Sequence, residues 1–421
     1  MWNRIEDKVL RGERLSSDEG VYLLTDAPLV ELGSLANEVR QRKTDPRIVT
    51  YVIDTNPNYT NWCTVDCHFC AFYRKPGKPA ADGYTHDVEG VMAMMESARK
   101  VGATTVLLQG GLNPEIPWAF YTSIIRESRQ RYPEITPHFF SAPEIHQMME
   151  VSGLGMEGVL QALFDAGQRT LPGGGAEVFS ERVRRELFGQ KIGAKRWLEI
   201  HEVAHQLGIP SNSTLLYGHI ETRAERVQHM IDLRELETRA PGFFAFIPLA
   251  FQPGTTGLVR RQASAIEDLK TIAISRLMFD NVPHIKGYWI MLGQDTAAAA
   301  LSFGASDLDG TIGQEKIAHA ALAKSPVGMA EAGMVQMIAR DVEGDYKLEP
   351  FYNGTLFKQG TELVALQRDN LEMGNIAPQD ISKQVPAWSI LTSAYLFRDA
   401  NHLNAFFASD LGAQMKKMAE D

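Results

Sequence analysis

Eight short β-rich runs, separated by longer amphipathic stretches, constrain the fold of this 421-residue chain most strongly. In the stretch 86–101, Val88, Val91, Met92 and Met95 recur at the spacing of one helix face. The β-rich runs span residues 49–53, 104–108, 136–140, 169–171, 213–217, 243–248, 285–291 and 301–305. Eight strands alternating with helices over about 270 residues predict an α/β fold, a closed (β/α)8 barrel of the TIM type. A doubly wound open sheet is the alternative, and it would leave the strand number of eight as a coincidence.

The position of these runs divides the chain into three predicted parts. Residues 1–48 precede the first run and contain Leu-rich stretches, so we expect an N-terminal helical segment. Residues 49–338 contain the eight runs and form the predicted barrel. Residues 339–421 include a later apolar stretch, and we expect a C-terminal extension of one or two helices docked on the barrel. Chemistry in such a barrel takes place at the C-terminal ends of the strands, so functional residues are expected in the loops that follow the runs.

All three cysteines of the chain, Cys63, Cys67 and Cys70, lie in the loop after the first run. Their C-x3-C-x2-C spacing provides three thiolates, which can hold three corners of a cubane [4Fe–4S] cluster. The fourth iron then has no protein ligand, so it can bind a small molecule and pass it an electron. A zinc site is the alternative, but structural zinc takes four ligands, and His68 between two of the cysteines is poorly placed to be the fourth.

This cysteine spacing resembles the signature of the radical S-adenosylmethionine (SAM) enzymes. In that family the open iron is chelated by the amino and carboxylate groups of SAM, and one electron from the cluster releases a 5'-deoxyadenosyl radical. The resemblance implies a radical SAM barrel with two cofactors, a [4Fe–4S] cluster on Cys63, Cys67 and Cys70 and SAM itself. It also implies an electron donor, which would be a reductase, a flavodoxin or a ferredoxin.

Two further loops provide candidate SAM contacts. Gln109, Gly110 and Gly111 follow the second run, and glycines let the backbone come close to a ligand. The equivalent turn of the family binds the methionine amino group, whereas an ordinary strand-to-loop turn is the alternative reading. Glu177 follows a triple glycine after the fourth run and is a candidate acceptor for the ribose hydroxyls. Phe69, beside Cys70, is a candidate to pack on the adenine.

The ends of the fifth and seventh runs provide further candidates. His219 and Glu221 stand at the predicted barrel mouth, where Glu221 is assigned to the cofactor site. His219 is a candidate acid, base or carboxylate-binding group, with a structural histidine as the equal alternative. Lys286 is a candidate partner for an anionic substrate, although strand alternation lets only some of these side chains face inward.

Longer phrases narrow the resemblance to the radical enzymes of the futalosine route to menaquinone, over roughly residues 45–340. This family has a synthase branch and a cyclase branch. The synthase branch is matched in residues 211–222, 246–251, 284–293, 307–311 and 315–319. The cyclase branch is matched in the N-terminal portion, in residues 58–61, 70–77 and 108–111. Because the later strand ends contact the substrate in such barrels, the match to the synthase branch carries more weight.

The synthase branch implies a transferase that consumes SAM as a substrate. The adenosyl radical adds to the enol-ether double bond of 3-[(1-carboxyvinyl)oxy]benzoate, and rearrangement with loss of a carboxyl group gives aminodeoxyfutalosine. The substrate is then a small dicarboxylate, with His219 and Lys286 as its candidate catalytic contacts. If the cyclase branch applies instead, the radical abstracts a ribose hydrogen from dehypoxanthine futalosine. A non-catalytic iron–sulfur protein is the alternative of another class.

Composition argues against several other partners. Forty-two basic against 52 acidic side chains give a formal charge of −10, so no nucleic-acid footprint is expected. The chain has no apolar run long enough for a membrane span. Its charged start, residues 1–8, lacks the apolar region of a secretion signal. Unpaired thiols and an oxygen-sensitive cluster require a reducing compartment, so we expect the protein in the cytoplasm.

Overall fold

The computed structural model describes residues 1–339, apart from residues 255, 311, 312, 314 and 327, and in the remaining C-terminal stretch residues 409, 414 and 417. The chain divides into two compact units, Met1–Tyr346 and Lys347–Asp421. The predicted C-terminal helices fall almost entirely outside the described residues. The predicted boundaries at residues 48 and 338 stay predictions.

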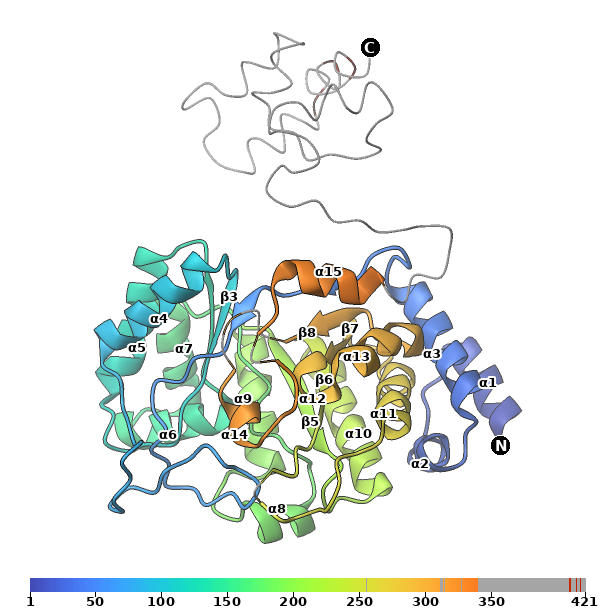
Figure 1. Ribbon diagram of the computed structural model, residues 1–421, viewed down its shortest axis with the longest axis horizontal. Coiled ribbons are helices and arrows are strands. Elements are labelled where there is room, and N and C mark those ends of the chain that lie inside the picture. The colour runs from blue at the N-terminus through green and yellow to red at the C-terminus, as the bar shows by residue number, and fades with distance from the viewer. Residues whose placement is uncertain are drawn as a thin grey trace. The chain divides into compact units, whose positions relative to one another are not determined.

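Parallel strands form the centre of the first unit (Figure 1). The described strands are β1 (Thr50–Tyr51), β2 (Asp54–Thr55), β3 (Thr105–Leu108), β4 (Thr136–Phe139), β5 (Ser211–Tyr217), β6 (Phe243–Ala250), β7 (His284–Tyr288) and β8 (Asp307–Asp309). One sheet has the order β1-β8-β7-β6-β5 and the other the order β2-β3-β4, and the described strands pair in parallel. The predicted α/β class is therefore confirmed.

The two sheets follow each other in the order expected of a barrel. They meet where β1 runs on into β2; the first predicted run, 49–53, contains β1, and β2 begins directly after it. On the other side, between β4 and β5, Leu171 makes a single parallel bridge to Ser211. The predicted run 169–171 therefore contributes one bridge and no strand of its own. Around the two sheets the strand order follows the chain order, which is consistent with the predicted barrel.

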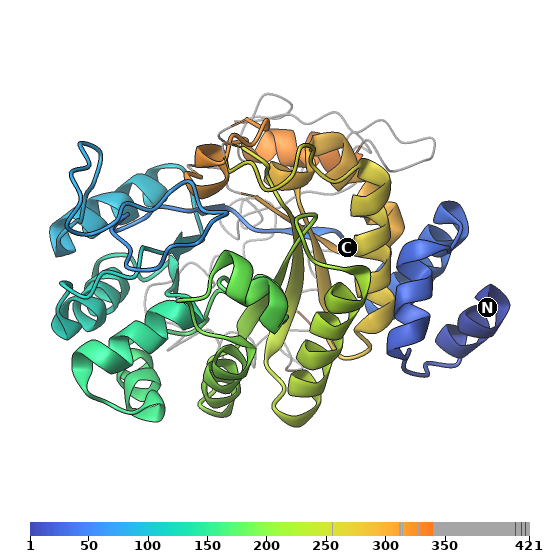
Figure 2. The ribbon, with the colours of Figure 1, turned by 90° about the horizontal axis from the view of Figure 1, so that it is seen from below.

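Helices form an outer layer around the strands, which Figure 2 shows in a view from below. The described helices are α1 (Trp2–Leu10), α2 (Ser17–Thr25), α3 (Leu29–Lys43), α4 (Val88–Lys100), α5 (Trp118–Arg131), α6 (Ala142–Ser152), α7 (Met156–Ala166), α8 (Glu181–Leu187), α9 (Ala194–Gln206), α10 (Arg223–Arg239), α11 (Ala265–Met278), α12 (Trp289–Leu292), α13 (Gln294–Ala300), α14 (Ile317–Ala320) and α15 (Glu331–Ala339), with a 3-10 helix η1 (Leu301–Phe303). The N-terminal helices α1–α3 precede the first strand, and α3 packs on α11.

Local sequence explains the helix boundaries. In α4 the pattern predicted an apolar face, and Val91, Met92 and Met95 are buried as expected. The side chain of Asp87 accepts a hydrogen bond from Gly90 N (2.8 Å) and caps the first turn. Gly102 follows the last turn in the left-handed conformation, with φ +75°, which ends the helix.

The last two predicted strands are displaced in the structure. The seventh ends at Tyr288 because the next residues turn into α12. The predicted strand at 301–305 is wrong, because the Ala-rich helix α13 continues into η1 at Leu301–Phe303. Gly304, with φ +96°, ends this helical stretch, and β8 begins only at Asp307.

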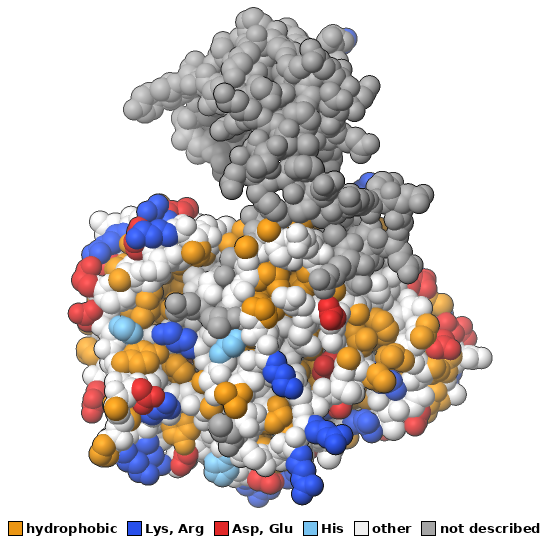
Figure 3. Space-filling view, viewed as in Figure 1, with side chains coloured by type: hydrophobic (Ala, Val, Ile, Leu, Met, Phe, Trp, Pro, Cys, Tyr) orange, Lys and Arg blue, Asp and Glu red, His pale blue; other side chains and the backbone are white. Residues whose placement is uncertain are grey.

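The described surface has two further features that bear on partners. On the face in Figure 3, acidic and basic side chains are interspersed, with hydrophobic side chains scattered among them. None of the helices in the described part of the chain combines the length and the apolar character of a membrane span.

Candidate active site

The cysteine loop follows β2 and is fixed by backbone hydrogen bonds. Cys63 N donates to Arg74 O (2.9 Å), and Cys70 N donates to Cys67 O (3.0 Å). The three thiols form no disulfide and are partly buried. All three line one cavity of about 260 Å³, which we call the outer cavity. The structure therefore brings the three predicted ligands to one site.

The donor set of the outer cavity fits the predicted cluster. In a cubane each thiolate binds a different iron, so the thiols stand around a shared space and do not converge on one point. Among the described residues, no three His, Cys, Asp or Glu side chains gather as a single-ion metal site would require. Burial raises the pKa of Cys67 to about 12 and also raises the pKa values of Cys63 and Cys70. A bound metal would take the place of the thiol protons, because a coordinating thiol is deprotonated.

The turn at Gln109–Gly111 packs against the cysteine loop and lines the outer cavity with it. A Cβ on Gly111 would lie 2.2 Å from the carbonyl oxygen of Trp62, and one on Gly110 would lie 2.6 Å from the ring of Tyr59. Glycine is therefore required here for the close packing of two loops, beyond the access to a ligand that the sequence suggested.

Glu144 also lines the outer cavity and was missed by the sequence reasoning. Its carboxylate accepts hydrogen bonds from Gly110 N (3.0 Å), Tyr59 Oη (2.7 Å) and Ser141 N (2.7 Å). Burial raises the pKa of Glu144, although these hydrogen bonds oppose the shift. The available signal was the capping box Ser141-x-x-Glu144 at the start of α6, which predicts a helix cap and gives no hint of a cavity.

Glu177 lies in the outer cavity as predicted, but it already has a partner. Its carboxylate forms a largely buried ion pair with Lys191. The Lys191 Nζ lies 5.8 Å from the centre of the Phe69 ring and 5.7 Å from that of Phe188. Lys191 is a second residue that the sequence reasoning missed, because a single lysine between β-rich runs carries no motif.

His219 and Glu221 line neither the outer cavity nor a second cavity that lies among the strands. Glu221 accepts hydrogen bonds from Gly218 N (2.7 Å) and His219 N (2.9 Å) and pairs with Arg226 at 2.6 Å. The His219 ring accepts from Ile220 N at Nδ1 (2.7 Å) and donates from Nε2 to a backbone carbonyl. These contacts favour a role in stabilising the loop after β5. The catalytic role of His219 and the cofactor-binding role of Glu221 stay predictions.

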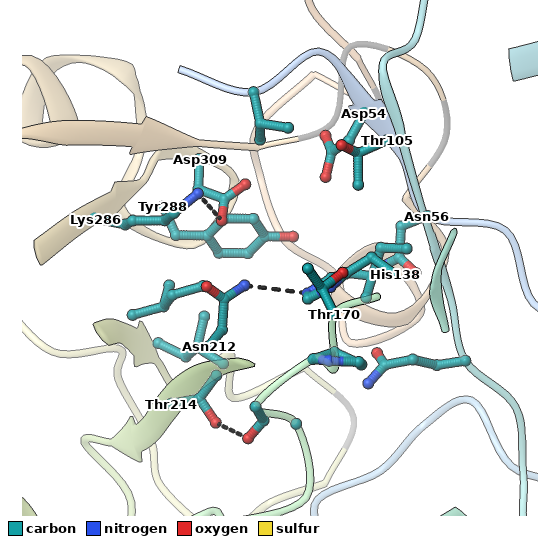
Figure 4. Close-up of a pocket in the computed structure, with 18 of the residues that line it drawn as sticks. Asp54, Asn56, Thr105, His138, Thr170, Asn212, Thr214, Lys286, Tyr288 and Asp309 are labelled. Atoms are coloured by element: carbon teal, nitrogen blue, oxygen red, sulfur yellow. Dashed lines mark hydrogen bonds and ion pairs between the residues drawn. The ribbon is translucent and has the colours of Figure 1, made fainter. Parts of the chain in front are cut away.

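A second cavity, also of about 260 Å³, lies among the strands, and we call it the inner cavity (Figure 4). Its polar wall is contributed by six strands and their ends, β2, β3, β4, β5, β7 and β8, together with Thr170 and Glu315. The polar lining residues are Asp54, Asn56, Thr105, Gln109, Thr136, His138, Thr170, Asn212, Thr214, Lys286, Tyr288, Asp309 and Glu315. In Figure 4, Lys286, Asp309 and Tyr288 stand on one side, and His138 and Thr170 stand on the other.

The two cavities adjoin each other. Gln109, Gly174, Leu249, Met291 and Ile317 line both of them. A ligand in the inner cavity can therefore contact a ligand in the outer cavity, next to the cysteines.

Lys286 lines the inner cavity, and its predicted contact with the substrate stays a prediction. Its Nζ lies 3.1 Å from Asp307 Oδ1 and 3.3 Å from Asp309 Oδ2. Burial lowers the pKa of Lys286, but Asp309 and Asp307 outweigh that effect and raise it. The lysine is therefore a charged group whose charge is already balanced by two carboxylates.

His138 faces Lys286 across the inner cavity as a neutral group. Burial, with a smaller contribution from Lys286, lowers the pKa of His138 to about 3. Its Nδ1 lies 2.8 Å from Thr170 Oγ1, and its Nε2 lies 3.2 Å from Asn212 Nδ2. With Nε2 accepting from the amide, the proton stands on Nδ1 and is donated to the threonine.

Comparison with known proteins agrees with this site. A family model described as the radical SAM superfamily matches residues 57–233. A second model, described as the CofH/MqnC C-terminal region, matches residues 240–342. Together these matches span the cysteine loop and most of the described strands.

Curated relatives match most of the chain. Aminodeoxyfutalosine synthase of Thermus thermophilus is 41% identical over 340 residues, which are 79% of this chain and 90% of that protein. Aminodeoxyfutalosine synthase of Streptomyces coelicolor is 40% identical over 326 residues, 75% of this chain and 84% of that protein. Cyclic dehypoxanthine futalosine synthase of the same organism is 36% identical over 323 residues, 76% of this chain and 81% of that protein.

The chain is thus an enzyme of the radical SAM type. It belongs to the radical SAM superfamily, and within it to the group that includes aminodeoxyfutalosine synthase and cyclic dehypoxanthine futalosine synthase. The resemblance noted from the sequence is confirmed, and the alternative of a non-catalytic iron–sulfur protein has no support from these relatives.

Solved structures support the fold alone. Methylornithine synthase aligns with a TM-score of 0.58 at 16% identity, covering 88% of this chain and 97% of that chain. The FeFe-hydrogenase maturase HydG from Carboxydothermus hydrogenoformans aligns with a TM-score of 0.61 at 17% identity, covering 96% of this chain and 92% of that chain.

The C-terminal stretch is similar to a different kind of protein. A model described as bacterial extracellular solute-binding protein, family 7, matches residues 317–421 and overlaps the CofH/MqnC match at residues 317–342. The sequence reasoning did not anticipate this similarity.

Proposed function

We propose that this enzyme joins the adenosyl group of SAM to 3-[(1-carboxyvinyl)oxy]benzoate and so forms aminodeoxyfutalosine in menaquinone biosynthesis. The observation that carries this proposal is the 41% and 40% identity to two aminodeoxyfutalosine synthases over most of the chain. The adjoining cavities support it, because the reaction must bring SAM and a second molecule into contact.

The cysteines of the outer cavity would hold a [4Fe–4S] cluster. When bound, this cluster supplies one electron that cleaves the sulfonium of SAM to the 5'-deoxyadenosyl radical. The Gln109–Gly111 turn and Phe69 line the same cavity. The turn would bind the methionine amino group, and Phe69 would pack on the adenine. Glu144 fixes that turn through Gly110 N and would keep it in position.

The inner cavity would hold the enol-ether benzoate, with its double bond directed toward the outer cavity. The apolar residues that line both cavities, Leu249, Met291 and Ile317, surround the junction. They would exclude water and hydrogen donors from the radical while the walls hold the two reacting carbons together. Lys286 and the polar groups around it would meet one carboxylate of the substrate.

Replacing Glu177 by Gln is expected to weaken SAM binding about tenfold, because a hydrogen bond to a charged acceptor contributes about 1.5–3 kcal/mol. The change also leaves Lys191 without its ion-pair partner. Anaerobic calorimetry with SAM would measure the effect. Glu181→Gln is the matched control, since Glu181 pairs with Arg184 on α8 and does not line the outer cavity. An unchanged affinity in Glu177→Gln would remove the proposed ribose contact.

Mass spectrometry of anaerobic reactions tests the function directly. Reconstituted protein, dithionite and SAM are supplied with the enol-ether benzoate in one tube and with dehypoxanthine futalosine in another. We expect an adenine-containing adduct in the first tube. A cyclised product with 5'-deoxyadenosine in the second would show instead that this chain works as cyclic dehypoxanthine futalosine synthase does, which its 36% identity to that enzyme makes the second candidate.

Two further expectations belong to this proposal. The electron donor would be a reductase, a flavodoxin or a ferredoxin, because the cluster must be reduced one electron at a time. The cytoplasm is the proposed location, because thiols and an oxygen-sensitive cluster need a reducing compartment.

A chain ending at Tyr346 is expected to keep full cluster loading and activity within about twofold of the full chain. The matches to the radical SAM and CofH/MqnC models end by residue 342, and residues 347–421 form a unit of their own. Activity of the two chains would be compared at equal iron content. A tenfold or larger loss in the shorter chain would assign residues 347–421 a part in catalysis or folding.

A further inference from the structure

Asp54 is a buried carboxyl group in the wall of the inner cavity that the sequence analysis did not single out. It lies on β2, is only 6% exposed, and its Oδ1 has no hydrogen-bond partner. Its neighbour across the strand pair is Thr105, which carries no charge. A buried carboxyl oxygen without a partner is costly unless a ligand or a proton satisfies it.

The charges around Asp54 leave no spare cation for an anionic ligand. Lys286 is the cation among the described residues that line the inner cavity, and it already contacts Asp307 and Asp309. An ionised Asp54 would therefore be a third negative charge, besides Asp307 and Asp309, near the single positive charge of Lys286. In Figure 4, Asp54 and Lys286 lie apart around the cavity, with Asp309 close to the lysine.

A dicarboxylate substrate must nevertheless place at least one carboxylate in this region. If Asp54 were ionised, a substrate carboxylate approaching Lys286 would face three carboxyl side chains of the cavity wall, Asp54, Asp309 and Glu315, in a low-dielectric space. If Asp54 carried a proton, its O–H would instead donate a hydrogen bond to that carboxylate, and the repulsion would vanish.

We propose that Asp54 acts as a neutral acid that donates a hydrogen bond to a substrate carboxylate lying between it and Lys286, and that it thereby determines specificity for an anionic substrate. This inference rests on the proposed function for the identity of the carboxylate. Burial, reinforced by Asp309, raises the pKa of Asp54 well above its ordinary value, which agrees with the protonated form.

The proposal fixes the sign of a pH effect on binding. The protonated form of Asp54 binds the substrate, so affinity is full below the raised pKa of Asp54 and falls as the pH rises through it. Lys286 stays charged, and His138, with a pKa of about 3, stays neutral over this range. Burial also raises the pKa of Glu315, so a variant at Asp54 is needed to separate the two carboxyl groups.

The test is calorimetric titration of 3-[(1-carboxyvinyl)oxy]benzoate into the cluster-loaded full chain with SAM bound and no reductant, between pH 6 and pH 9. For the wild type we expect Kd to rise as the pH increases, by up to about tenfold per pH unit above the pKa of Asp54. Asp54→Asn keeps a donor and cannot ionise, so it should bind within about threefold of the wild type at pH 6 and lose the pH dependence. Asp54→Leu removes the donor and should bind at least about tenfold more weakly at pH 6.

Controls separate this inference from the proposed function. Asp18→Asn, on the exposed face of α2, should behave as the wild type at every pH. A wild-type pH profile in Asp54→Asn would overturn the inference and leave the proposed function standing. If the wild type binds no enol-ether benzoate at any pH, the proposed function fails and the inference fails with it. If Asp54→Leu does not load the cluster, the pH profile of Asp54→Asn alone decides.

Discussion

Cys67→Ala is expected to lose both the iron–sulfur cluster and all turnover. The thiol lines the outer cavity with Cys63 and Cys70, and two thiolates leave two corners of a cubane without protein ligands. The visible absorption that reports such a cluster should disappear, and SAM should no longer be cleaved under dithionite. This change should have the largest effect on activity, because every later step depends on the radical.

His68→Ala is the matched control for the cysteine variant. His68 lies directly beside Cys67 in the chain, but it is not among the residues that line the outer cavity. Its variant should keep the cluster and most of the activity. Wild-type activity in Cys67→Ala would show that this loop does not hold the cluster of a radical SAM enzyme. Loss of the cluster in His68→Ala would indicate that His68 is one of its ligands.

Gly111→Ala is expected to destabilise the first unit and prevent cluster loading. The added Cβ would lie 2.2 Å from the backbone oxygen of Trp62 and 2.9 Å from Cys63 Cβ. Because the nearest atom belongs to the backbone, no side-chain rotation relieves the clash, and the cysteine loop must move. Overpacking of this kind costs about 1–3 kcal/mol, and we expect the higher end of that range with a fall in Tm of several degrees.

Gly155→Ala provides the control for the glycine variant. Gly155 precedes α7 with a φ of −68°, and an added Cβ there would meet nothing within 4 Å. Thermal unfolding and iron content would be measured for both variants. Full cluster loading and an unchanged Tm in Gly111→Ala would show that the turn and the cysteine loop are less tightly packed than the structure indicates.

The sequence by itself determined the class of the fold and predicted the cluster site. Cys63, Cys67 and Cys70 lie within eight residues, so their chemistry is local and can be predicted from their spacing. The alternation of β-rich and amphipathic stretches likewise predicted parallel strands covered by helices. The predicted position of the eighth strand was wrong because the apolar run after the Ala-rich helix fits a helix as well as a strand. The left-handed Gly304 ends the helical stretch, and the strand begins after it.

Only the tertiary structure decided which polar residues meet in the cavities. Glu144 lies on α6, Asp54 on β2 and Lys191 between α8 and α9, and no sequence motif marks any of them as a cavity residue. His219 stands in a phrase typical of the family, yet its ring bonds to Ile220 N in its own loop and to Leu216 O on β5. The physical reason is that burial and charge balance depend on contacts between residues far apart in the chain. The pairing of Lys286 with two aspartates and the protonation proposed for Asp54 exist only once the strands stand side by side.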